Sequence, residues 1–192
     1  EDISLNNHAL LALFTASCML KDVELCLSIH DALSFKGLFV GLDVYVSSSL
    51  ISLYAKCGHL ALAEDVFNKL AARNVVTWNA MISAHAKYGQ GRDALCFYQQ
   101  MQEEGVSPDD RAFVIALQAC YMLAEGEGSV HQDVLRRAQI LHASAWIKSL
   151  ESDVFVGNAL VSLYGKCGKI TEAENVFFRL PIRDIVSWNA LI

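Results

Sequence analysis

Residues 43–82 read DVYVSSSLISLYAKCGHLALAEDVFNKLAARNVVTWNAMI, and residues 153–192 read DVFVGNALVSLYGKCGKITEAENVFFRLPIRDIVSWNALI. The two stretches are identical at 21 of 40 positions when they are aligned at an offset of 110 residues. Self-similarity at a fixed period is the signature of a repeat architecture, in which one small unit recurs along the chain. We therefore take the repeat, rather than any single motif, as the feature that decides the fold.

A shorter period runs inside the 110-residue block, because residues 48–70 align with residues 79–101 at an offset of 31. Apolar side chains in this second copy fall at helical spacing in two runs: Trp78, Met81, Ile82 and His85, then Ala94, Phe97, Tyr98 and Met101. Gly89 and Gly105 follow the two runs, where a left-handed residue ends a helix at least cost. One unit is therefore predicted to be helix, turn, helix, turn. A single helical hairpin cannot bury its apolar face, so the units are expected to stack into an all-α solenoid.

Composition and charge exclude several classes of protein. The 192 residues are 54% hydrophobic and 19% charged, which excludes a disordered chain, and they contain no run of eighteen apolar residues, so we expect no membrane span. The formal net charge of -6 has the wrong sign for holding polyanions by bulk electrostatics. A nucleic-acid role must therefore rest on individually placed groups. The chain begins without Met and stops within an apolar pattern, so we expect a piece of a longer protein with no readable targeting peptide.

The six cysteines are expected to be reduced, because the chain is large and apolar enough to fold without disulfides. None has the spacing of a zinc or redox motif, so we predict no metal and no cofactor. His30 and His142 occupy equivalent places in the repeat and are expected to be packed rather than catalytic. No catalytic signature is present, deaminase motifs included, so this chain is not expected to be an enzyme.

At this point the residues resemble a known family. VVTWNAMISAHAKYGQGRDALCFYQQMQEEGVSPD (75–109) resembles a pentatricopeptide repeat (PPR), with its Trp-Asn opening and its Gly-Val-x-Pro-Asp closing turn. Residues 43–74 resemble the short variant of that repeat, and two units containing Ala-Cys or Ser-Cys resemble the long variant. The order of variants is similar to that of the plant PLS subclass, whose members select sites for organellar RNA editing. The resemblance implies a right-handed superhelical α-solenoid.

The resemblance also implies unit boundaries. They are a long-type unit with a degenerate start at 1–42, a short-type unit at 43–74, an ordinary (P-type) unit at 75–109, a long-type unit with an insertion near 125–133 at 110–153, a short-type unit at 154–184, and the first helix of a truncated P-type unit at 185–192.

Two positions in each unit are predicted to read one base of single-stranded RNA. The fifth residue of a unit lies in the first turn of its first helix, and the closing residue comes just before the next unit. Short amides, hydroxyls and carboxylates at these two positions can form hydrogen bonds with the edge of a base. The fifth residues are Ser48, Asn79, Val114, Asn158 and Asn189, and the closing residues are Asp43, Asn74, Asp109, Asp153 and Asp184. The other interpretation of Asn79 and Asn158 is that they cap helices.

The family's recognition code implies the RNA sequence. By that resemblance, Ser48 with Asn74 favours adenine, while Asn79 with Asp109 and Asn158 with Asp184 favour uracil. Val114 with Asp153 departs from the informative pairs. The resemblance thus implies a core of 5′-A-U-N-U, followed by a pyrimidine at Asn189.

Two further sets of residues are predicted to hold the RNA. Tyr45, Val76, Phe155 and Val186 lie three residues before reading positions, where the family stacks bases; the alternative is packing between repeats. Lys56, Lys87 and Lys166 recur at the end of first helices, where they can contact phosphates or merely complement the helix dipole. The acids noted in the sequence fall in second helices, away from these lysines.

The resemblance implies that a C-terminal or partner module, such as a deaminase domain or editing cofactor proteins, acts on the selected RNA in a mitochondrion or chloroplast. The alternative function is that of a helical scaffold, similar to tetratricopeptide repeats, which binds a protein or peptide.

Overall fold

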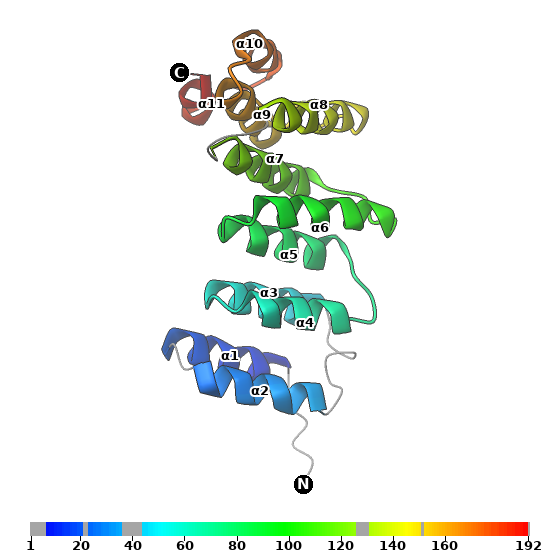
Figure 1. The fold of residues 1–192 in the computed structure, drawn as a ribbon, viewed down its shortest axis with the longest axis vertical. Helices are drawn as coiled ribbons and strands as arrows, with labels where there is room; N and C mark the ends of the chain where they lie inside the picture. Colours follow the sequence, from blue (N-terminus) through cyan, green and yellow to red (C-terminus); the bar gives the residue numbers. More distant parts are fainter. Residues whose placement is uncertain (1–6, 21–22, 36–43, 126–130, 151, 192) are drawn as a thin grey trace. The chain divides into compact units, whose positions relative to one another are not determined.

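The computed structural model describes residues 7–20, 23–35, 44–125, 131–150 and 152–191 (Figure 1). These residues form helices joined by turns, without strands. In chain order the helices are α1 (Asn7–Leu20), α2 (Val23–Phe35), α3 (Val44–Lys56), α4 (Leu60–Lys69), α5 (Val75–Lys87), α6 (Gly91–Glu103), α7 (Asp110–Glu125), α8 (His131–Ile147), α9 (Val154–Lys166), α10 (Ile170–Arg179) and α11 (Ile185–Leu191). The predicted all-α class is confirmed for this part of the chain.

The predicted helix ends at Gly89 and Gly105 are confirmed. α5 ends at Lys87 and α6 at Glu103, and the two glycines follow with φ of +75° and +77°. Gly58 and Gly168 do the same after α3 and α9. These backbone angles are left-handed, and glycine adopts them without the steric cost that a Cβ would bring.

The chain divides into two compact units, Glu1–His85 and Ala86–Ile192. In the first unit α1 packs against α2 and α3, and α3 packs against α4. In the second unit α7 packs against α8 and α9, and α9 packs against α10 and α11. Within each unit, a first helix thus contacts both its own hairpin partner and the first helix of the next repeat. The boundaries of the six repeats stay a prediction; of the expected insertion, residues 126–130 lie outside the described residues.

One aromatic arrangement recurs in both units. Phe67 of α4 and Trp78 of α5 meet edge to face with ring centroids 4.7 Å apart, and Phe177 and Trp188 repeat this contact at 4.7 Å. Phe67 and Phe177 are buried, so each anchors the core of its own hairpin. Such pairs stabilise by about 0.5–1.5 kcal/mol beyond the area they bury. The contact joins a short-type hairpin to the helix that follows it.

A second recurring contact joins a long-type hairpin to the short-type one. His30 Nδ1 lies 3.0 Å from Tyr54 Oη, and His142 Nδ1 lies 3.0 Å from Tyr164 Oη. His30 is buried, and burial together with the nearby Arg179 lowers the pKa of His142. Both histidines are thus packed between helices, where hydrogen bonds compensate for their burial.

The prediction that all six cysteines are reduced is wrong at Cys57, which is disulfide-bonded. The reasoning failed because a disulfide requires only that packing bring two sulfurs together, whether or not the fold needs one. Cys96, Cys120 and Cys167 are free thiols. Burial raises the pKa of Cys120 to about 12, so this thiol is protonated and unreactive at neutral pH.

Candidate functional site

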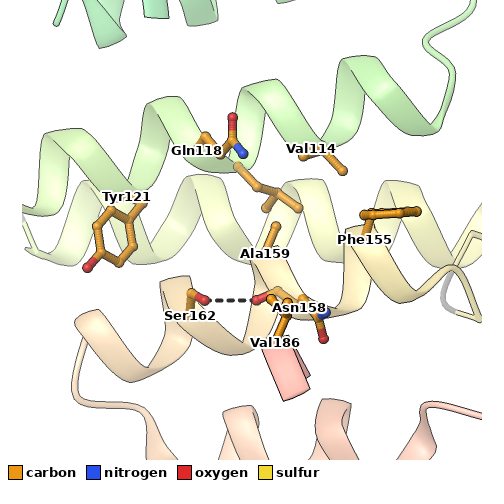
Figure 2. Close-up of a pocket in the computed structure, with 9 residues that line it drawn as sticks. Val114, Gln118, Tyr121, Phe155, Asn158, Ala159, Ser162 and Val186 are labelled. Atoms are coloured by element: carbon orange, nitrogen blue, oxygen red, sulfur yellow. Dashed lines mark hydrogen bonds between the residues drawn. The ribbon is translucent and has the colours of Figure 1, made fainter. Parts of the chain in front are cut away.

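A cavity of about 370 Å³ lies between the first helices α7 and α9 of the second unit (Figure 2). α7 supplies one wall, α9 supplies the other, and α11 contributes one residue. The lining residues are Val114, Leu117, Gln118, Tyr121, Phe155, Asn158, Ala159, Ser162 and Val186. Three predicted RNA contacts, Phe155, Asn158 and Val186, therefore meet in one hollow.

Asn158 is the buried polar group of this cavity. Its side-chain Nδ2 donates a hydrogen bond to Asp184 Oδ1 over 3.4 Å. Its Oδ1 is buried without a hydrogen-bond partner among the described residues, and the residue is only 7% exposed. The carboxylate accepts only, so it fixes which way the amide points. An unsatisfied buried acceptor costs about 1–3 kcal/mol, so this atom favours a ligand that donates a hydrogen bond to it.

Asp184 serves two purposes. Its Oδ1 accepts hydrogen bonds from the Ser187 backbone N–H at 2.8 Å and from the Ser187 hydroxyl at 2.9 Å, and so caps α11. These bonds from Ser187 lower the pKa of Asp184, which is therefore ionised at neutral pH. The Val186 backbone N–H and the Asn158 amide also donate hydrogen bonds to this carboxylate. Asp184 therefore caps α11 and orients the Asn158 side chain at the same time.

The other closing residues also cap helices. Oδ1 of Asn74, Asp109 and Asp153 accepts a backbone N–H bond from the first turn of α5, α7 and α9, respectively, at 2.8–3.1 Å. The closing residues therefore cap these helices, and the Asn158 amide bonds to Asp184 instead. Asp43 lies outside the described residues.

The remaining fifth residues lie in different surroundings. Asn79 is 4% exposed. Ser48 is half-buried, its hydroxyl donates to the Tyr45 carbonyl at 3.1 Å, and no hydrogen bond in the described segments joins it to Asn74. Asn189 is exposed on α11. Asn79 belongs to the first compact unit and Asp109 to the second, so the structure brings together one complete reading pair, Asn158 with Asp184.

The four predicted stacking residues have exposed side chains. Tyr45 is 68% exposed, Val76 47%, Phe155 73% and Val186 58%. A side chain that packs between repeats would lie below about one-tenth exposure, as the core residues here do. The exposure disfavours the packing alternative and leaves flat or branched surfaces available to a base.

The predicted phosphate contacts Lys56, Lys87 and Lys166 are exposed at the ends of α3, α5 and α9. Lys166 has two partners that the sequence did not predict. Its Nζ lies 3.2 Å from Glu125 Oε1 and 5.4 Å from the centroid of the Tyr121 ring. Glu125, which ends the first helix α7, thus adds an acid beside the predicted phosphate contact.

The sequence reasoning also missed Gln118, Tyr121 and Ser162, which line the cavity. Gln118 lies one helical turn after Val114, and Ser162 lies one turn after Asn158. Residues four apart share a helix face, so this spacing would have found both. Ser162 Oγ donates to the Asn158 backbone carbonyl at 2.9 Å (Figure 2).

The described residues contain neither a candidate metal site nor a candidate membrane span. No group of three or more His, Cys, Asp or Glu side chains gathers where it could hold a metal ion. No helix among them combines the length and apolar character needed to cross a membrane.

Family models match this sequence in three places. The model described as the PPR repeat family matches residues 73–122, and the model described as PPR repeat matches residues 45–75 and 158–185. Together these matches cover more than half of the chain.

The sequence is similar to plant proteins. It is 40% identical over 149 residues to the pentatricopeptide repeat-containing protein At4g25270, chloroplastic, of Arabidopsis thaliana, covering 77% of this chain and 27% of that protein. It is 34% identical over 187 residues to the pentatricopeptide repeat-containing protein CRR2, chloroplastic, of the same plant, covering 96% and 27%. The chain thus spans about a quarter of the length of these relatives.

Solved structures share the fold. The crystal structure of the pentatricopeptide repeat protein PPR10 from maize matches with a TM-score of 0.64 and 17% identity, covering 95% of this chain and 26% of that one. PPR10 in complex with an 18-nt psaJ RNA element matches with a TM-score of 0.63 and 16% identity, covering 97% and 25%. These likenesses confirm the predicted fold class, an α-solenoid of helix-turn-helix repeats.

Proposed function

Because this chain belongs to the pentatricopeptide repeat family, we propose that it binds single-stranded RNA and selects it by sequence. One observation carries the proposal: the buried, unpaired Oδ1 of Asn158 beside Asp184, in a cavity flanked by the exposed side chains of Phe155 and Val186. A base can stack against Phe155 while its edge pairs with the amide and carboxylate. The likeness to a PPR10 complex with RNA supports this choice of ligand.

The pair Asn158–Asp184 favours uracil in this proposal. Uracil presents one N–H donor between two carbonyl acceptors, and we expect the Asp184 carboxylate, which holds the Asn158 amide nitrogen through Oδ1, to accept that donor. By the family's code the other pairs extend the preference to 5′-A-U-N-U, read by Ser48 with Asn74, Asn79 with Asp109, an uninformative Val114 unit, and Asn158 with Asp184.

We further propose that the chain acts in the processing of organellar RNA. The chloroplastic relatives support an organellar location, chloroplast before mitochondrion. The order of repeat variants supports the PLS subclass, and with it site selection for C-to-U editing or other RNA processing. No catalytic signature is present in the sequence, so a C-terminal or partner module would carry out the chemistry.

A binding assay tests the proposal. Fluorescence anisotropy at low salt is expected to show that an oligomer containing A-U-N-U binds more tightly than one whose last U is replaced by A. Asn158→Ala is expected to weaken binding to the first oligomer roughly tenfold, because a base loses its hydrogen bond within the cavity. Asp184→Asn keeps a capping oxygen, as Asn74 shows, and is expected to relax the choice of base.

Asn175→Ala is the matched control, since Asn175 is exposed on the second helix α10. It should bind like the unmodified chain. If the chain binds none of these oligomers, the proposal fails and the helical scaffold for a peptide becomes the better account.

A further inference from the structure

The Val114 unit lacks a polar fifth residue, although its wall of the cavity is not apolar throughout. Val114 has no hydrogen-bonding group in its side chain. Gln118 lies four residues later on α7 and lines the same cavity, so both face the hollow shared with Phe155 (Figure 2). The polar group on this wall is therefore displaced by one helical turn rather than missing.

Several of the other polar groups that line the cavity are already engaged. The Ser162 hydroxyl donates its hydrogen to the Asn158 backbone carbonyl, and the Asn158 amide nitrogen is bonded to Asp184. The Tyr121 ring faces the Lys166 ammonium. Gln118 is exposed, and among the described residues its carboxamide makes no hydrogen bond. Its carboxamide can therefore offer a donor and an acceptor side by side to one base edge.

We propose that Gln118 is a further specificity-determining residue, which hydrogen-bonds the base at the third position of A-U-N-U and favours adenine there. This inference rests on the proposed RNA-binding function. Asp153, the closing residue of the unit, uses its Oδ1 to cap α9. Only its other carboxylate oxygen is left to accept a hydrogen bond from a base. Gln118 thus takes the place that an amide or hydroxyl at position 114 would fill.

Adenine is favoured because of the pattern on its edges. A carboxamide presents one donor beside one acceptor, and it pairs bidentately with adenine N6–H and N7. Adenine shows a donor next to an acceptor on its Watson–Crick edge as well, so it matches Gln118 in either orientation. Guanine presents two acceptors on its Hoogsteen edge, so it matches in only one orientation. Uracil and cytosine carry a donor beside an acceptor only on the Watson–Crick edge, so on the Hoogsteen edge adenine alone matches the Gln118 carboxamide.

Four oligomers that differ only in the third base of A-U-N-U test the inference. The 192-residue chain is expected to bind the adenine version at least fivefold more tightly than the other three, the low end of the range for a bidentate pair. Gln118→Leu keeps the size of the side chain and removes the carboxamide. It is expected to bind all four within about twofold of one another. Gln139→Leu, an exposed residue of α8, should keep the fivefold preference.

The outcomes separate the two proposals. If the chain binds A-U-N-U but shows no adenine preference, or if Gln118→Leu keeps the preference, the role of Gln118 is overturned while RNA binding stands. If no oligomer binds, both fail together. Circular dichroism shows whether Gln118→Leu is folded, and Gln118→Glu, which accepts but cannot donate at neutral pH, is expected to lose the adenine preference as a second variant.

Discussion

The closing residue of each repeat has to satisfy the backbone and a ligand with one side chain. Asn74 and Asp184 both cap the next helix through Oδ1. A cap needs a short side chain with an acceptor oxygen, and asparagine, aspartate and serine meet this need about equally well. Asparagine and aspartate also keep a second polar atom, an amide nitrogen or a second oxygen. These two residue types can therefore cap the helix and still present different hydrogen-bonding patterns to a base.

Asp65 gives a pH-dependent contribution to stability. Burial raises the pKa of this carboxyl group, but hydrogen bonds from Lys69 at 2.6 Å and His30 at 2.9 Å outweigh it and hold the pKa below 3.8. A carboxyl group whose pKa is lowered on folding stabilises the protein at pH values above its pKa in the unfolded chain. This contribution to stability is lost as the pH falls through the pKa of the folded state. Because the carboxylate is 38% exposed, we expect Asp65→Asn to reduce the free energy of unfolding by about 0.5–1 kcal/mol at pH 5.

Urea unfolding at pH 5 and at pH 3 measures this difference. The deficit of Asp65→Asn should shrink at pH 3, where the unmodified chain begins to lose the same interaction. Asp31→Asn, which alters an exposed residue of α2, should unfold like the unmodified chain at both values. An equal deficit at pH 5 and pH 3 would contradict the ionic origin.

Part of the candidate site could be predicted from residue spacing alone. Asn158, Phe155 and Val186 were found because they recur at the repeat period, and Asp184 was found because it closes a unit. Gln118 was not predicted because the repeat period singles out Val114, which lies one helical turn earlier on the same face of α7. The Lys166–Glu125 pair was not predicted because Glu125 lies beside an insertion that breaks the repeat. The other repeats therefore contain no equivalent residue from which its contact with Lys166 could be inferred.

At the scale of helices, the sequence predicts hairpins better than it predicts the contacts between them. The periodic apolar residues and Gly89 and Gly105 locate α5 and α6 because helix period and backbone freedom are local properties. The Phe67–Trp78 contact and the His30–Tyr54 bond join separate helices. Those partners follow from three-dimensional stacking, which residue spacing along one helix does not specify.

α6 approaches α7 so closely that its first residue must be glycine. A Cβ on Gly91 would lie 2.9 Å from the Ala119 carbonyl oxygen and 3.2 Å from Leu123 Cγ. The carbonyl belongs to the backbone of α7 and cannot move without disturbing that helix. Gly91→Ala is therefore expected to lower the free energy of unfolding by about 1–3 kcal/mol, the usual cost of overpacking. Urea denaturation measures it.

Gly165→Ala is the matched control for this substitution. Gly165 lies within α9, and a Cβ there would meet Ala190 O at 4.0 Å, an ordinary contact. Replacing a helical glycine by alanine stabilises by up to about 1 kcal/mol. The two substitutions should therefore change stability in opposite directions. Stabilisation by both would mean that α6 and α7 can separate at little cost.

Over the whole molecule, a net charge of -6 opposes the binding of a polyanion. Three exposed lysines at the ends of first helices provide local positive charge. If each contacts one phosphate, the logarithm of the binding constant should fall with the logarithm of salt concentration with a slope of about -2, since single strands give roughly -0.7 per contact. That slope is shallow, so most of the affinity has to come from stacking and hydrogen bonds in the repeats.

The charge of Lys166, one of these three lysines, is partly neutralised by an acid of the second unit. Its Nζ lies 3.2 Å from Glu125 Oε1. Glu125→Gln removes that acid and frees the ammonium for a phosphate. An exposed ion pair contributes at most about 1 kcal/mol, so RNA binding should tighten by no more than about fivefold. Glu174→Gln changes the net charge equally on the exposed face of α10. If anisotropy titrations between 50 and 200 mM salt give both variants the same change, the effect comes from total charge and Lys166 does not contact the RNA.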